Sequence, residues 1–285
     1  MSGFCMLERA QRTLRREVRY SGVGIHFGKS ATITLEPAKE NTGIVFCRSD
    51  LLGEHIPALL PHVCNTGRST TLSSGDSIIA TVEHLMAALR SSNIDNVIVR
   101  CDEEEIPIGD GSSHVFMQLI HDAGVCTQND KVSIARLSQP VYYQAQDTFL
   151  AAFPCDELKI SYTLHYPQSP TIGTQYRSFV ITEESFRKEI APCRTFALYN
   201  ELCFLMERGL IGGGCLENAV VFKDDGVISL GQLRFPDEPV RHKILDLIGD
   251  LSLVGRPFVA HIVAVGSGHS SNIALGRKIL EVLQP

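Results

Sequence analysis

Residues 240–254 read V-R-H-K-I-L-D-L-I-G-D-L-S-L-V and carry metal-binding side chains at helical spacing. His242, Asp246 and Asp250 stand four residues apart, so on a helix they form one stripe. The remaining circumference is mostly apolar, being formed by Ile244, Leu245, Leu247, Ile248 and Leu251. A helix that is apolar nearly all round is buried, and buried charges are costly without a partner. The stripe therefore predicts either a bound metal ion or a buried ion-pair network, which is the commoner outcome for one isolated motif.

Two adjacent residues in an earlier segment supply what a metal site on that stripe lacks. Residues 78–89 are rich in Ala, Leu and Met, which predicts a helix with Glu83 and His84 near its start. Neighbouring helical residues point about 100° apart, so His84 can bind an ion while Glu83 lies beside it. His84, His242 and Asp246 form a ligand set that leaves a fourth zinc position open for water. Zinc lowers the pKa of that water towards ~7, and Glu83 is placed to act as general base.

A further histidine, His269, lies in the glycine–serine loop G-S-G-H-S-S-N, just after the apolar segment 258–265. A sheet holds such a loop still, which suits a catalytic group. Asp250, one turn beyond Asp246, can orient His269 and raise its pKa, so that a cationic imidazole stabilises an oxyanion and protonates a leaving amine. Lys243 can bring another positive charge to the substrate. Together these residues predict metal-assisted hydrolysis of an amide, with a spacing unlike the H-E-x-x-H of thermolysin-like peptidases.

Three alternatives fit the same residues. A non-catalytic protein with a structural metal site needs a fourth protein ligand, and none of the nine cysteines is spaced to supply one. A metal hydrolase can act on a different amide or on a phosphoester. A binding module can hold the same charges as an ion-pair network without metal.

The rest of the chain predicts an α+β fold of two similar domains. In the first half, strands are expected at residues 11–20, 31–36, 43–47 and 94–100, and helices at 78–89 and 115–123. A polar break, Q-N-D-K, follows, so the expected domains are 1–127 and 128–285. The second half again runs from strands to helices, with helices at 183–190, 198–208, 240–254 and 273–283. A helix–glycine–strand unit interrupts this half, and we interpret it as an insert that serves a binding site.

Composition limits the class of protein. The chain has 285 residues, 44% of them hydrophobic, which is enough for a full core. A net charge of −6 argues against a nucleic-acid partner. Nine cysteines without a C-x-x-C pair indicate reduced thiols in the cytoplasm. The chain has no apolar run near the ~20 residues that a membrane helix needs, and no apolar region typical of a secretory signal.

Seven separate motifs resemble one known family in the same order along essentially the whole chain. They are S-G-V-G-I-H at 21–26, T-V-E-H-L at 81–85, I-D-N-V at 94–97, E-I-P-I-x-D-G-S at 105–112, R-T-F at 194–196, R-H-K-I-L-D-L-I-G-D-L at 241–251 and S-G-H at 267–269. The family is that of the zinc-dependent UDP-3-O-acyl-N-acetylglucosamine deacetylases, chlamydial members included. These enzymes carry out the committed step of lipid A biosynthesis in Gram-negative bacteria.

This resemblance implies roles for the candidate residues. Zn²⁺, or alternatively Fe²⁺, would be held by His84, His242 and Asp246, with Glu83 as general base and His269, oriented by Asp250, as general acid or oxyanion stabiliser. Lys243 would bind substrate and stabilise the transition state. Thr195 would contact the oxyanion, Phe196 would pack on the sugar, and His26 would lie near the active site. Cys193, Ala197 and Gly266 depart from the family pattern and leave the substrate contacts beside them open.

The resemblance also implies an architecture and partners. Helices would be sandwiched between two mostly antiparallel sheets, one in each domain, and each domain would carry an insert. The second insert, a β-α-β unit around residues 197–225, would form a passage for the 3-O-acyl chain. Its apolar residues, including Leu202 and Ile211, suit such a channel but also suit an ordinary core. The partner would be a lipid-linked UDP-sugar, bound by a cytoplasmic monomer that works near a membrane without spanning it.

Overall fold

The first large sheet belongs to the N-terminal half of the computed structural model, which describes residues 7–51 and 55–283. Its strand order is β2 (Val18–Val23), β3 (Ser30–Pro37), β9 (Val97–Cys101), β4 (Ile44–Arg48) and β5 (His55–Pro57). All neighbours are antiparallel except β4 and β9. The alternation A-T-I-T-L-E in β3 buries Ala31, Ile33 and Leu35 on one face, as a half-buried strand requires.

The second large sheet has seven strands. Its main path is β1 (Leu7–Leu14), β10 (Val125–Arg136), β18 (Phe258–Val265), β12 (Thr148–Phe153) and β11 (Val141–Ala145). β13 (Leu158–Tyr166) pairs with β18 and with β14 (Gly173–Val180). The single strand expected at residues 11–20 is wrong: β1 and β2 lie in different sheets and are separated by residues 15–17. The expected boundary after residue 127 falls inside β10, which runs without interruption past it.

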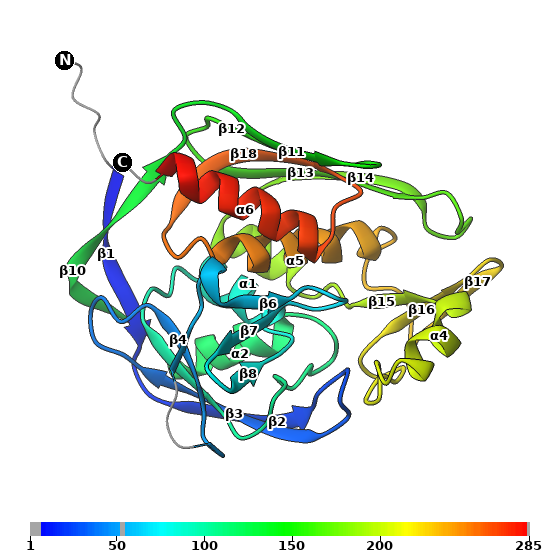
Figure 1. The fold of residues 1–285 in the computed structure, drawn as a ribbon, viewed down its shortest axis with the longest axis horizontal. Coiled ribbons are helices and arrows are strands. Elements are labelled where there is room, and N and C mark those ends of the chain that lie inside the picture. Colours follow the sequence, from blue (N-terminus) through cyan, green and yellow to red (C-terminus); the bar gives the residue numbers. More distant parts are fainter. Residues whose placement is uncertain (1–6, 52–54, 284–285) are drawn as a thin grey trace.

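Helices fill the space between the two large sheets, which confirms the α+β fold (Figure 1). They are α1 (Glu83–Ser91), α2 (His114–Ala123), α5 (Glu238–Ser252) and α6 (His269–Leu283). α5 packs on both α1 and α6. Gly249 explains how closely α1 and α5 approach, since a Cβ there would lie 2.1 Å from the Glu83 carbonyl oxygen. This contact brings the start of α1 against the α5 stripe that carries the candidate metal ligands.

Two of the helix boundaries that differ from expectation involve predicted site residues. The helix expected at residues 78–89 begins only at Glu83, because β8 (Ser77–Ile79) and the positive φ of Thr81 precede it. The last helix begins at His269, four residues earlier than expected, so His269 sits on the first turn of α6. Both errors arise because short polar or β-branched stretches carry little periodicity of their own.

Each half carries a small three-stranded sheet. The first consists of β6 (Val63–Asn65), β7 (Thr71–Ser74) and β8, preceded by the 3-10 turn η1 (Leu60–His62). The second consists of β15 (Phe196–Leu198), β16 (Val220–Lys223) and β17 (Gly226–Ile228). Between the parallel strands β15 and β16 lie η3 (Tyr199–Glu201) and α4 (Leu202–Glu207). We refer to residues 196–228 as the second insert. A short helical segment, α3 (Glu183–Ser185) followed by η2 (Phe186–Ile190), precedes it.

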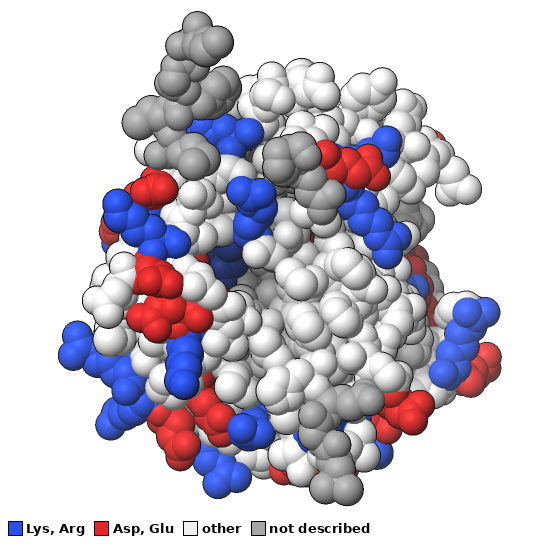
Figure 2. All heavy atoms as spheres, turned by 60° about the vertical axis from the view of Figure 1, so that its left-hand side comes forward, with Lys and Arg blue, Asp and Glu red and all other residues white. Residues whose placement is uncertain are grey.

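The surface carries charges of both signs. On the face drawn in Figure 2, Lys and Arg side chains are interspersed with Asp and Glu around a broad uncharged area. Within residues 7–51 and 55–283, no helix combines the length and the apolar character needed to cross a membrane.

Candidate metal centre and active site

Three buried side chains from α1 and α5 meet between the sheets. The Nε2 atoms of His84 and His242 lie 3.6 Å and 3.3 Å from Asp246 Oδ1. The two imidazole rings are edge to face, with centroids 4.9 Å apart. One ligand atom from each residue lies within 4.8 Å of the other two, which is compatible with a single shared ion. The predicted metal set is thus brought together as a candidate site.

The chemistry of this cluster fits a divalent metal. His242 Nδ1 lies 3.0 Å from the Cys193 carbonyl oxygen, so the opposite ring nitrogen faces Asp246. Burial lowers the pKa of His242 to about 4, which favours the neutral imidazole that a metal needs. Among the residues that the structure describes, neither the buried Asp246 Oδ1 nor the buried His84 Nδ1 has a hydrogen-bond partner. An orphaned carboxylate oxygen facing two imidazoles is costly, and a cation between them would satisfy it.

Glu83 lies beside this cluster and is buried. Its Oε2 accepts a hydrogen bond of 3.0 Å from the Thr70 backbone N–H, and its Oε1 lies 3.9 Å from His269 Nε2. Burial raises the pKa of Glu83, while the His269 charge works in the opposite direction. A carboxylate with a raised pKa next to a histidine is a better proton acceptor than an ordinary carboxylate.

Asp250 holds His269 in place. Its Oδ2 lies 2.9 Å from His269 Nδ1 and accepts a 2.8 Å hydrogen bond from Asn272 Nδ2. Its Oδ1 accepts a 2.6 Å hydrogen bond from the Thr70 hydroxyl. Burial lowers the pKa of His269, but the charge and hydrogen bond of Asp250, together with Glu83, raise it overall to about 9. His269 is therefore cationic at neutral pH.

Thr70 and Asn272 are contacts that the sequence did not reveal. Thr70 touches both Glu83 and Asp250, which are 13 and 180 residues away in the chain, so no local spacing signals it. Asn272 is three residues after His269 and therefore faces the same side of α6. Had the helix been predicted to begin at His269, that spacing would have indicated that Asn272 lies beside it and can contact Asp250.

Lys243 and Phe196 border the metal set on one side. Lys243 Nζ donates to Asp246 Oδ2 at 2.8 Å and lies 5.5 Å from the centroid of the Phe196 ring. Burial opposes the Lys243 charge, but Asp246 outweighs it and raises the lysine pKa. The Phe196 ring lies edge to face with Tyr166, at 5.8 Å between centroids. A fixed ammonium and an aromatic face thus point at the same site.

Two cavities meet at the metal set. One, of about 440 Å³, is polar and lies between β11–β12, the start of α6 and the stripe of α5. The other, of about 330 Å³, is mostly apolar and lies against the second insert. We call them the polar cavity and the apolar passage. The residues that line both, which we call the junction, are Arg68, Glu83, His84, Thr195 and Phe196.

The remaining predicted residues fall in these cavities. Lys243 and His269 line the polar cavity, while His26, Leu202 and Ile211 line the apolar passage. Thr195, at the junction, is anchored by its backbone N–H, which donates to the Gly111 carbonyl at 2.8 Å. The loop of His26 is fixed by a buried carboxylate, since Glu105 Oε1 accepts the His26 backbone N–H at 2.9 Å.

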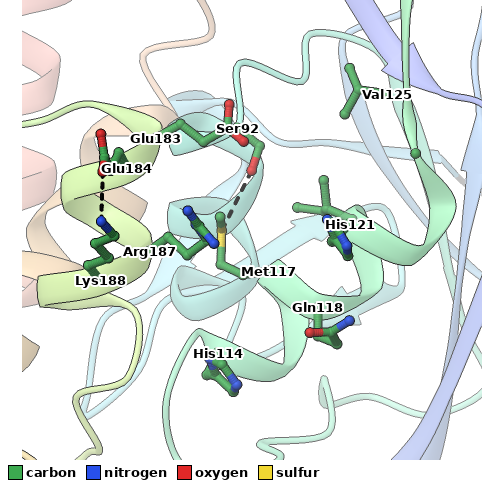
Figure 3. A pocket seen from close by; sticks show the side chains of 12 residues that line it. Ser92, His114, Met117, Gln118, His121, Val125, Glu183, Glu184, Arg187 and Lys188 are labelled. Carbon is green, nitrogen blue, oxygen red and sulfur yellow. Dashed lines mark hydrogen bonds and ion pairs between the residues drawn. The ribbon is translucent and has the colours of Figure 1, made fainter.

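A more voluminous cavity than either of these lies elsewhere. It measures about 860 Å³ and opens between α2 and the α3–η2 segment. Figure 3 shows Arg187 reaching across it towards Met117 of α2, while Lys188 pairs with Glu184 within its own segment. None of the predicted site residues lines this cavity. Cavity volume alone would therefore point away from the candidate metal centre.

Comparison with known proteins agrees with this geometry. Residues 11–281 match the model of the family described as UDP-3-O-acyl N-acetylglycosamine deacetylase (LpxC). The chain is 95% identical over 280 residues to the UDP-3-O-acyl-N-acetylglucosamine deacetylase of Chlamydia caviae, covering 98% of this chain and 100% of that protein. The proteins of that name from Chlamydia felis and Chlamydia pneumoniae are 92% and 79% identical, again covering 98% of this chain and 100% of their own length. Its motifs, its fold and these matches agree, and the chain belongs to the UDP-3-O-acyl N-acetylglycosamine deacetylase family.

Proposed function

We propose that this protein removes acetate from UDP-3-O-acyl-N-acetylglucosamine, the committed step of lipid A biosynthesis. Its membership of the family and the name of its relatives support this substrate. The observation that carries the proposal is the placement of an acid–base pair, Glu83 and His269, beside the metal set at the meeting point of two cavities. Amide hydrolysis needs both a base and an acid at one carbonyl.

The metal would be Zn²⁺ or Fe²⁺, held by His84, His242 and Asp246. When bound, such an ion polarises a carbonyl oxygen and activates water. Within the described residues the cluster comprises three ligands, which leaves room for an exogenous one. This feature favours a catalytic site over a structural one, since structural zinc sites are closed by four protein ligands.

The protein's own residues divide the proton transfers. Glu83 takes a proton from the attacking water, helped by a pKa that burial raises. His269, cationic through Asp250, stabilises the developing oxyanion and gives a proton to the leaving amine. Thr195 adds a hydroxyl donor to the oxyanion, and Lys243 adds a positive charge.

The two cavities match the two halves of this substrate. The polar cavity takes the sugar and nucleotide, with Phe196 packing on the sugar ring. The apolar passage takes the 3-O-acyl chain along Leu202 and Ile211, with His26 near its inner end. Among the described residues the cysteines are free thiols, which supports a reducing compartment and hence the cytoplasm. A monomeric state and a location close to the membrane surface remain predictions.

The direct test is acetate release from UDP-3-O-acyl-N-acetylglucosamine by the metal-loaded protein. We expect turnover that a chelator abolishes and that added Zn²⁺ restores. The Glu83→Gln variant serves as a matched control, since it keeps the metal ligands. Chelator-resistant turnover would overturn the metal assignment. Absence of turnover by metal-loaded protein, with hydrolysis of another amide instead, would favour the alternative substrate class.

A further inference from the structure

Arg68 occupies a special position among the residues of the site. Of the junction residues, it is the only Lys or Arg, and its side chain borders both the polar cavity and the apolar passage. Burial is the main cause that lowers the pKa of His26, and the Arg68 charge adds to it. The guanidinium charge thus acts on His26, a residue that lines the apolar passage.

Glu201 of η3 holds Arg68 from the opposite side. Arg68 Nη2 lies 2.9 Å from Glu201 Oε2, and both side chains are partly exposed. This ion pair joins the turn between β6 and β7 to the second insert, although Arg68 and Glu201 are 133 residues apart in the chain. An exposed ion pair contributes little to stability. Its main consequence is therefore where it places the remaining guanidinium donors.

The backbone of Arg68 is also held in an unusual conformation. Its φ is +74°, in the left-handed region that non-glycine residues adopt at a cost. Two residues later, Thr70 bonds to both Glu83 and Asp250. Thr70 therefore anchors this turn to Glu83 and Asp250, while Arg68 in the same turn borders both cavities.

The chemistry of the proposed substrate fits this position. The acetamide on C2 of the sugar lies next to the C3 oxygen that carries the acyl chain. With the acetamide at the metal set and the chain in the apolar passage, the ester oxygens come to the junction. A guanidinium is suited to such oxygens because it offers several N–H donors in a fixed plane.

We propose that Arg68, positioned by Glu201, binds the oxygen atoms that join the sugar to its acyl chain and thereby selects acylated substrates. This inference rests on the proposed function, because it takes its ligand from that substrate. Arg68 is a specificity-determining residue in this scheme, and Glu201 is a positioning residue.

The test measures binding separately from turnover. Calorimetry on metal-loaded Glu83→Gln protein compares UDP-3-O-acyl-N-acetylglucosamine with UDP-N-acetylglucosamine, which lacks the chain. Arg68→Gly is the informative variant, since glycine accepts the positive φ without strain. We expect it to weaken binding of the acylated ligand roughly 10- to 100-fold, because a charged hydrogen bond is lost. Binding of the unacylated ligand should change less than about twofold, and Arg68→Lys should restore part of the loss.

Glu201→Gln should weaken binding of the acylated ligand alone, by roughly two- to fivefold. An equal loss for both ligands in Arg68→Gly would overturn the proposal in favour of a contact with the diphosphate, and no loss for either would overturn it outright. An unchanged Glu201→Gln would overturn the positioning role. If wild-type protein releases no acetate from the acylated substrate, the proposed function itself fails, which separates the two outcomes.

Discussion

The proposed catalytic cluster and the apolar passage are built in different ways. The cluster stands on α1, α5 and α6, where Glu83, His84, His242 and Asp246 are at most 3% exposed. The passage stands on the second insert, whose short elements leave Tyr199, Phe204 and Met206 between 49% and 67% exposed. Reacting groups need fixed positions, which long packed helices provide. An acyl chain needs only an apolar surface to pack against, which a small insert can provide.

The difference predicts separable functional effects. Variants in the cluster should reduce kcat for every substrate, since they act on the reacting atoms. Variants in the passage should change KM according to the acyl chain, since they act on uniform binding. Mutations should therefore separate catalysis from acyl-chain binding, according to whether they fall in the helical cluster or in the second insert.

The largest effect is expected from His242→Ala. The variant removes one of three candidate ligands and leaves Asp246 Oδ1 with a single imidazole facing it. We expect loss of the bound metal and of detectable acetate release. Elemental analysis beside the acetate assay checks both. His165→Ala is the control, since that histidine is exposed and, in the described structure, its side chain hydrogen-bonds only to Thr174. Metal content equal to that of wild-type protein would break the ligand assignment.

Glu83→Gln should reduce kcat strongly while keeping the metal. The amide oxygen can still accept the Thr70 backbone N–H, so the geometry is preserved while the base is lost. General-base catalysis contributes roughly 10²- to 10⁴-fold, and we expect a loss of that size for short and long acyl chains alike. Steady-state kinetics with two chain lengths makes the measurement. A loss confined to the longer chain would contradict the separation of the two regions.

Asp250→Asn should shift the basic limb of the pH profile. Asp250 raises the pKa of His269 to about 9, so the cationic acid is present below that pH and is lost as pH rises through it. Without the Asp250 charge, burial lowers that pKa and only the charges of Glu83 and Asp246 oppose it, so the limb should move down by roughly one to three pH units. A profile of kcat/KM between pH 6 and about 10 tests this shift. An unmoved limb would remove His269 as the titrating acid.

Sequence reasoning worked best where one helix carried the signal. The spacing of His242, Asp246 and Asp250 along α5 predicted burial and a shared face, and the structure has both. The pairing of α5 with α1 was not visible, because it depends on Gly249 fitting against the Glu83 carbonyl. The resemblance to a family supplied that long-range information.

The parts that could not be predicted depend on contacts far apart in sequence. Thr70 bonds to Asp250 across 180 residues, and Arg68, in the turn between β6 and β7, pairs with Glu201 of the second insert. The assignment of residues 7–14 to the second sheet depends on pairing with β10, which no local pattern specifies. Strand partners and turn contacts are set by tertiary packing, whereas helical faces are set by local periodicity.

The smallest effect, and the most selective, is expected from Leu202→Ala. Leu202 lines the apolar passage and is partly buried, so a bound chain would complete its burial. Losing part of that contact should raise KM for a long acyl chain by roughly five- to tenfold, at about 0.8 kcal/mol for each methylene no longer covered. Leu230→Ala is the matched control, because Leu230 is 65% exposed and lies outside the residues lining the passage. The kcat of Leu202→Ala should stay unchanged, since Leu202 lines the apolar passage and not the polar cavity that holds His242, Asp246 and His269. A matching loss for a short chain, or a fall in kcat, would show that the insert and the helical cluster act as one unit.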